Sequence, residues 1–127
     1  MEETSKKHIL LVEDDVFMID LLAHELAAAG FTVTIAKTGK EGVEKYDKVK
    51  PDLIVLDILL PDQDGFETLR QIRRKPEGML AKVIILSNIA EGSNVEEARR
   101  LGVLDYLIKA NLSLADIIEK IRSVLGT

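Results

Sequence analysis

The stretch Leu53-Ile54-Val55-Leu56-Asp57 places an unbroken apolar run directly before an acid. Strands that are buried on both faces of a parallel sheet have this continuous apolar character, whereas half-exposed strands alternate between apolar and polar residues. Residues 8–12 and 83–86 form similar runs, and weaker β-type runs lie at residues 31–35 and 105–108. The sequence therefore predicts five short strands.

Longer amphipathic segments separate these runs and are predicted to be helices. The last of them carries apolar residues at helical spacing, namely Leu114, Ile117, Ile118, Ile121, Val124 and Leu125. Gly30 stands where a left-handed residue would end the first helix. Helix starts are indicated by Ser or Thr followed three residues later by an acid, at Thr38 with Glu41, Ser93 with Glu96 and Ser113 with Asp116.

Strand and helix segments alternate along the whole chain, which predicts an α/β fold of five βα units. Such units form a parallel sheet with right-handed crossovers and with helices on both faces. Ligands of open parallel sheets bind beyond the carboxyl ends of the strands. The residues that follow each apolar run are therefore the candidates for function.

The composition narrows the class of protein. A chain of 127 residues fits one domain, and its net charge of −5 argues against a nucleic-acid or membrane-surface partner. The absence of cysteine excludes disulfides, thiolate metal sites and cysteine nucleophiles, and it suits a reducing cytoplasm. The first residues contain no apolar segment of signal-peptide type, and no run reaches membrane-spanning length. We therefore expect a cytoplasmic protein.

Polar residues follow four of the five predicted strands. In chain order they are Glu13-Asp14-Asp15, Asp57, Ser87 and Lys109. In a parallel sheet they converge on one edge, so that carboxylates, a hydroxyl and an ammonium share one cleft.

Carboxylates brought this close repel one another. At an effective dielectric constant of about 20, two charges ~4 Å apart cost on the order of 4 kcal/mol. Either some are protonated or a cation neutralises them, and oxygen ligands without His or Cys favour Mg²⁺ or Mn²⁺. A magnesium ion, a carboxylate nucleophile and an ammonium together are the requirements for phosphoryl transfer to an aspartate.

Each residue also has a simpler interpretation. Asp14 and Asp15 could be an N-cap and a first-turn acid that the helix dipole favours. Ser87 alone could be a turn residue, and Lys109 alone a solvated charge. An acid directly after a buried strand, like Asp57, is harder to explain in this way, and the set is more specific than any member.

Taken together, these motifs resemble the receiver domain of two-component response regulators. The resemblance rests on Val12-Glu13-Asp14-Asp15, Leu56-Asp57 followed by Leu60-Pro61-Asp62-Gln63-Asp64-Gly65, Leu86-Ser87, and Tyr106-Leu107-Ile108-Lys109. It extends over about residues 8–125 of one domain spanning residues 1–127, with no effector domain in the chain. It implies a flavodoxin-like, doubly wound sheet with the strand order 2-1-3-4-5.

The resemblance implies a role for each matching position. Asp57 matches the phosphoacceptor, which takes a phosphoryl group from a sensor histidine kinase, a phosphotransfer protein or a small donor. The metal ligands would be Asp14, Asp15, Asp57 and the backbone carbonyl of Leu59. The residues that would bind the phosphoryl group or switch upon phosphorylation are Ser87, Lys109 and Tyr106.

The sequence departs from the family pattern at several of these places. Ala110 follows the lysine where proline is usual, and the peptide bond before it could be cis or trans. Asn88 follows the switch hydroxyl where a very small residue is typical. Leu59 and Ile89 occupy positions that flank the path of hydrolytic water, and their apolar side chains suggest a long-lived aspartyl phosphate or simple packing of the cleft rim.

Other functions remain open at this stage. A degenerate receiver could serve as a phosphorylation-independent binding scaffold, which the departures at Asn88 and Ala110 would favour. A magnesium-dependent phosphatase of the haloacid-dehalogenase type would need a second Asp where this chain has Leu59, so we expect a signalling phosphoacceptor and no enzyme. Gly39-Lys40-Glu41-Gly42 matches neither common nucleotide-binding loop.

The response would pass to a downstream protein or to a covalently attached output domain. Partners, or a second copy in a homodimer, would bind the face formed by the fourth helix, fifth strand and fifth helix. Its mixed charges comprise Glu96, Glu97, Arg99, Arg100, Asp105, Lys120 and Arg122.

Overall fold

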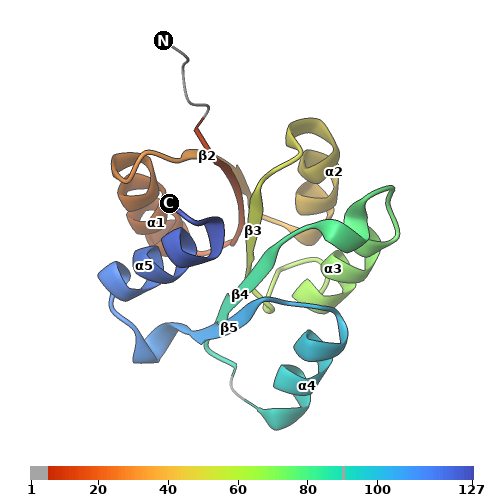
Figure 1. Cartoon of the computed structure of the whole chain (residues 1–127). Coiled ribbons are helices and arrows are strands. Elements are labelled where there is room, and N and C mark those ends of the chain that lie inside the picture. The colour runs from red at the N-terminus through yellow and green to blue at the C-terminus, as the bar shows by residue number, and fades with distance from the viewer. Residues whose placement is uncertain (1–5, 90) are drawn as a thin grey trace.

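A computed structural model describes residues 6–89 and 91–127, which alternate between strands and helices (Figure 1). The strands are β1 (His8–Val12), β2 (Thr32–Ala36), β3 (Leu53–Leu56), β4 (Val83–Ser87) and β5 (Asp105–Ile108). The α-helices are α1 (Val16–Ala28), α2 (Gly39–Val49), α3 (Gly65–Arg73), α4 (Gly92–Arg100) and α5 (Leu114–Leu125). Short 3-10 turns, η1 (Gly78–Leu80) and η2 (Lys109–Asn111), precede β4 and α5.

All paired strands run parallel, in the order β2-β1-β3-β4-β5. Helices α1 and α5 cover one face of the sheet, and α2, α3 and α4 cover the other (Figure 1). This arrangement confirms the predicted five-stranded, flavodoxin-like sheet. It also brings the carboxyl ends of β1, β3, β4 and β5 to one edge.

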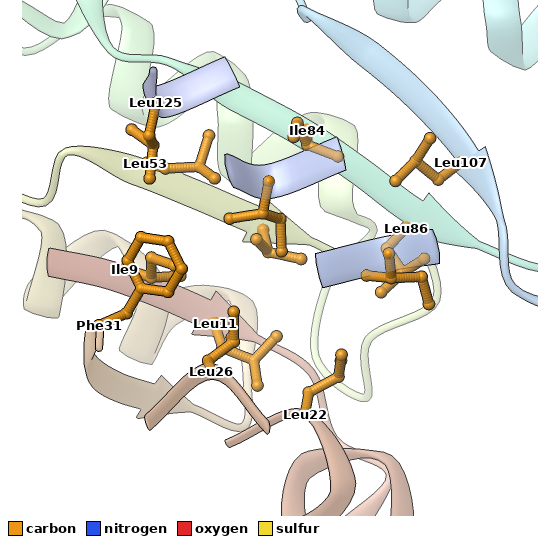
Figure 2. Close-up of a cluster of buried hydrophobic side chains, with 13 residues drawn as sticks. Ile9, Leu11, Leu22, Leu26, Phe31, Leu53, Ile84, Leu86, Leu107 and Leu125 are labelled. Carbon is orange, nitrogen blue, oxygen red and sulfur yellow. The ribbon is translucent and has the colours of Figure 1, made fainter. Parts of the chain in front are cut away.

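Consecutive residues of the central strands pack into opposite faces. Ile9 and Leu11 of β1 join the cluster beneath α1 and α5 that Figure 2 shows, whereas Leu10 and Val12 join the cluster beneath α2 and α3. Strand β3 divides in the same way and is buried along its full length. Burial on both faces explains why the apolar runs do not alternate.

Two of the three predicted helix-start signals are confirmed in whole or part. Ser113 and Asp116 form a reciprocal capping box at the start of α5. Thr38 Oγ1 accepts the N–H of Glu41 at 3.0 Å, although the Glu41 carboxylate bonds to the backbone of Lys37 and not to the N-cap. The prediction for Ser93 was wrong, because α4 already begins at Gly92, one residue before it.

The end of α1 agrees with the sequence pattern, and the start of β2 differs from it by one residue. Gly30 has a φ of +98°, as expected of the residue that leads the chain out of α1. Strand β2 is shifted by one residue from the predicted 31–35, because the N–H of Phe31 donates to Leu26 O at 3.0 Å and so closes the end of α1. The side chain of Phe31 lies in the core beneath α1 and α5 (Figure 2). No helix within residues 6–89 and 91–127 is long and apolar enough to cross a membrane.

The loop that follows β3 is anchored to the start of α2. Both carboxylate oxygens of Asp62 accept backbone N–H groups of that helix, from Gly39 at 2.8 Å and from Lys40 at 2.9 Å. Slight burial raises the pKa of Asp62, but these N–H groups outweigh it and leave the pKa lowered. The anchor holds the loop that carries Leu59 beside the phosphoacceptor candidate.

We expect Asp62→Asn to lower the stability of the protein near neutral pH. A charge at a helix N-terminus contributes about 0.3–1 kcal/mol. Because the folded-state pKa lies below the ordinary value of 3.8, this contribution is complete above that value and is lost as the pH falls through the folded-state pKa. Urea unfolding of both proteins at pH ~7 and pH ~3 should therefore show a difference that shrinks in acid.

Asp20→Asn is the matched control, since Asp20 is an exposed acid on α1. A stability loss for Asp62→Asn that is equal at both pH values would show that the charge does not provide the anchor.

Candidate functional site

The carboxyl ends of four strands surround a cavity of about 320 Å³. The residues that line it are Glu13, Asp14, Asp15, Asp57, Leu59, Ser87, Asn88 and Lys109. The cavity thus contains all the candidate site residues that the sequence named with a role, except Tyr106 and Ile89. Glu13, which the sequence placed at the end of the first strand without a role of its own, and Asn88 also line it.

Asp57 lies at the centre of this site and is only 6% exposed. Its Oδ1 accepts the backbone N–H of Ile58 at 2.7 Å, and its Oδ2 accepts an N–H of Lys109 at 3.0 Å. Helix α3 begins directly against its backbone: a Cβ on Gly65 would lie 2.2 Å from the Asp57 carbonyl oxygen. Only glycine fits there, so the start of α3 and the position of Asp57 are set together.

Lys109 bridges two buried carboxylates. Its Nζ lies 2.6 Å from Oε1 of Glu13 and 3.0 Å from Oδ2 of Asp57. Burial lowers the pKa of Lys109, but the hydrogen bonds to Glu13 and Asp57 outweigh it and leave the pKa raised. The ammonium is therefore charged at neutral pH and offsets part of the negative charge in the cavity.

Glu13 is a functional candidate that the sequence placed at a strand end but to which it assigned no role. It is 2% exposed, and its backbone N–H continues the β1–β2 hydrogen bonding by donating to Ala36 O at 2.9 Å. Burial raises the pKa of Glu13, against the opposing bonds from Lys109 and from the N–H of Asp15. A possible signal was its place directly after the buried Val12, where it extends the strand into the cleft.

Asp14 and Asp15 have different environments. Glu13, Asp14 and Asp57 each offer a carboxylate oxygen within 4.8 Å of the others, which is a possible metal site. Asp15 lines the same cavity, but its Oδ1 accepts the N–H groups of Phe17 and Met18 and so caps α1. An N-cap within this acidic pair is thus confirmed at Asp15, whereas neither acid lies in the first turn of α1. The role of Asp15 as a metal ligand stays a prediction.

The loop after β4 links the two predicted switch residues. Ser87 is fully buried, and its Oγ accepts the N–H of Ile89 at 3.3 Å. The hydroxyl of Tyr106 donates to the carbonyl oxygen of Ile89 at 2.6 Å. Burial raises the pKa of Tyr106, and the negative charges of Asp57 and Glu91 act in the same direction. Ile89 therefore lies between the hydroxyl of Ser87 and the aromatic ring on β5.

The two residues expected to control water access lie in different places. Leu59 is 62% exposed and lines the cavity. The side chain of Ile89 packs against the cluster beneath α4 that contains Phe66 and Ala98.

The peptide bond between Lys109 and Ala110 is trans. Of the two forms that the sequence left open for the bond before Ala110, the structure thus has the trans form.

Comparison with known proteins defines the class to which this fold and site belong. The sequence model of the response regulator receiver domain matches residues 9–122. The chain therefore belongs to the response regulator receiver domain family. Its general role is phosphorelay signal transduction, and it is a signalling domain.

Relatives within the family include both short and long proteins. The chemotaxis protein CheY of Listeria monocytogenes is 38% identical over 102 residues, which are 80% of this chain and 84% of that protein. The alkaline phosphatase synthesis transcriptional regulatory protein PhoP of Bacillus subtilis is 32% identical over 119 residues, 94% of this chain but 48% of that protein. A CheY-like receiver domain protein of Methanospirillum hungatei has a solved structure with a TM-score of 0.86 and 32% identity, covering 96% of this chain and 95% of that one.

The different environments of Asp14 and Asp15 lead to a prediction about metal binding. A ligand that binds the native state raises the melting temperature. We expect Asp14→Ala to abolish most of the rise in Tm that saturating Mg²⁺ produces. Asp15→Ala should lower the Tm without metal, because it removes a helix cap worth about 0.5–2 kcal/mol, but should keep a larger part of the magnesium-dependent rise than Asp14→Ala does.

Differential scanning calorimetry with and without Mg²⁺ measures both effects. Loss of the magnesium-dependent rise in Asp15→Ala and its retention in Asp14→Ala would reverse this assignment.

Proposed function

We propose that this chain is a phosphorylation switch in which Asp57 accepts a phosphoryl group. The donor would be the phosphohistidine of a sensor histidine kinase or phosphotransfer protein, or a small molecule such as acetyl phosphate. The observation that carries the proposal is the position of Asp57, a buried carboxylate with Lys109 on one oxygen and backbone N–H groups on the other. This arrangement orients a nucleophile and supplies a positive charge where a phosphoryl group would arrive.

The transfer needs few groups from the protein. One carboxylate oxygen of Asp57 forms the new P–O bond while the P–N bond to the donor imidazole breaks, and the electron pair of that bond returns to the imidazole nitrogen. Lys109 would pair with the oxygens of the phosphoryl group, and the Ser87 hydroxyl, whose hydrogen can still be donated, would bind another. The protein thus acts mainly by positioning and by offsetting charge.

The acidic cluster fits a divalent cation such as Mg²⁺ or Mn²⁺. Ionised Glu13, Asp14 and Asp57 with protonated Lys109 carry −3 + 1 = −2 within one small cavity. All the side-chain donors are hard oxygens, which suits these ions. Asp14 and Asp57 would hold the ion together with the Leu59 carbonyl and with either Glu13 or Asp15. A bound cation supplies positive charge that offsets the charge of the incoming phosphoryl group.

The switch would run from Ser87 to Tyr106. A phosphoryl group on Asp57 adds oxygens that attract the Ser87 hydroxyl, and movement of that residue pulls on Ile89, to which it is hydrogen-bonded. Ile89 in turn accepts the hydrogen bond of Tyr106, so the aromatic ring on β5 would report the state of the site. The output would be a partner protein or an attached domain.

We also propose that the chain can form a homodimer through the face made by α4, β5 and α5. Several charged residues on this face already pair within the chain, since Arg99 lies 3.2 Å from Glu96 and Lys120 lies 3.8 Å from Asp105. These pairs are exposed and contribute little, so they could exchange for contacts across a dimer at small cost.

The scaffold alternative rested on Asn88 and Ala110. With both residues present, the cavity remains about 320 Å³ in volume and Lys109 still reaches Asp57. This geometry favours phosphorylation over the scaffold function.

Phosphorylation can be tested by mass. We expect incubation with Mg²⁺ and acetyl phosphate to add one phosphoryl group, detected by intact-protein mass spectrometry. The adduct should be absent from Asp57→Asn, because an amide cannot act as the nucleophile. An adduct on Asp57→Asn, or no adduct on the parent chain with acetyl phosphate and a cognate kinase, would contradict the proposed function.

The lifetime of the phosphorylated state provides another test. Neither Leu59 nor Ile89 can orient a water molecule by hydrogen bonding. We expect the double variant Leu59→Asn, Ile89→Glu to lose its phosphoryl group faster than the parent chain, measured as the half-life after removal of the donor. The single variants separate the exposed Leu59 from the packed Ile89, and an unchanged half-life in the double variant would show that both residues only pack.

A further inference from the structure

Two segments at the mouth of the cavity are joined by one hydrogen bond. The backbone N–H of Ala110 donates to the side-chain Oδ1 of Asn88 at 3.0 Å. Asn88 directly follows the buried Ser87 and lines the cavity, and Ala110 directly follows Lys109. The bond therefore connects the neighbour of Ser87, which lines the cavity from the end of β4, with the neighbour of Lys109, whose ammonium pairs with Asp57.

The local structure of η2 explains why this bond forms. The turn begins at Lys109, and the residue before it, Ile108, provides no side-chain cap. The first N–H groups of a helical turn have no partner within it, so the N–H of Ala110 needs an acceptor from elsewhere. Asn88 supplies that acceptor, and only its Oδ1 can do so because the amide nitrogen is a donor. The bond also requires a residue other than proline at position 110, since proline has no N–H.

The position of the bond gives it a consequence for the site. Lys109 reaches Asp57 through a long, flexible side chain that starts from this turn. Ser87 is held rigidly at the end of β4 by full burial. A tie from the residue after Ser87 to the residue after Lys109 fixes the distance between the starting points of the two phosphoryl-binding side chains.

We propose that Asn88 is a positioning residue of the phosphoryl site, which holds the Lys109 turn against the end of β4 by accepting the N–H of Ala110. This inference rests on the proposed function of Asp57 as a phosphoacceptor. Asn88 acts through Lys109 and supplies none of the carboxylate oxygens of the acidic cluster. Its loss should therefore weaken phosphoryl binding and leave metal binding as it is.

The experiment measures two affinities on each protein. Beryllofluoride, a mimic of the phosphoryl group, is titrated in saturating Mg²⁺, and Mg²⁺ alone is titrated separately, both by isothermal calorimetry. Asn88→Ala removes the acceptor, and Ala110→Pro removes the donor. Each should raise the beryllofluoride Kd by about three- to tenfold, the range expected for one exposed hydrogen bond, with an unchanged Kd for Mg²⁺.

Controls and a double variant separate this bond from other effects. Asn111→Ala makes the same chemical change at the exposed neighbour in the same turn and should bind beryllofluoride like the parent chain. Ala110→Ser keeps the N–H and should lose much less affinity than Ala110→Pro. The double variant Asn88→Ala, Ala110→Pro should bind beryllofluoride as Ala110→Pro does, because the bond that Asn88→Ala removes is already absent from Ala110→Pro.

The proposal is overturned if Asn88→Ala binds beryllofluoride like the parent chain, if the two losses add in the double variant, or if the Mg²⁺ affinity falls by the same factor. Should Asn88→Ala fail to fold at the assay temperature, Ala110→Pro and Ala110→Ser decide the question. A parent chain that binds no beryllofluoride and takes up no phosphoryl group would instead contradict the proposed function itself.

Discussion

The ammonium of Lys109 lies between the carboxylates of Glu13 and Asp57, and the rest of the site depends on this contact. Two buried acids side by side would repel strongly, and desolvation would favour their neutral forms. One buried cation from the far end of the sheet lets them remain close. The contact joins residues 96 and 52 positions apart in the chain, so it can form only when β1, β3 and β5 are in register.

The sheet supplies that register through burial. Strands β1 and β3 present apolar residues to both faces, and a slip of one residue would move Asp57 away from Gly65 and from Lys109. The polar groups of the site lie where these strands end. A rigid apolar sheet thus carries a polar site whose loops, anchored by Asp62 and Asn88, surround one cavity.

Much of the site followed from the order of residues alone. Asp57, Ser87 and Lys109 could be named because each follows an apolar run, and the parallel fold brings such positions together. The assignment within Glu13-Asp14-Asp15 could not be made in this way. Three consecutive acids look alike in sequence, and only the path of the chain shows that Glu13 extends β1, that Asp14 joins the cluster and that Asp15 caps α1. The start of α4 was misplaced for a similar reason, since Ser93 matches a capping signal but lies inside the helix.

The sequence by itself determined the five-stranded α/β fold, the edge that carries the site and the chemical groups available there. It could do so because hydrophobic periodicity and the position of polar residues are local properties that the chain keeps when it folds. Only the tertiary structure decided which acid meets Lys109, that Leu59 faces the cavity while Ile89 packs beneath α4, and that Asn88 binds Ala110. These are contacts between residues distant in sequence, and their partners depend on distances of a few ångströms that no local pattern records.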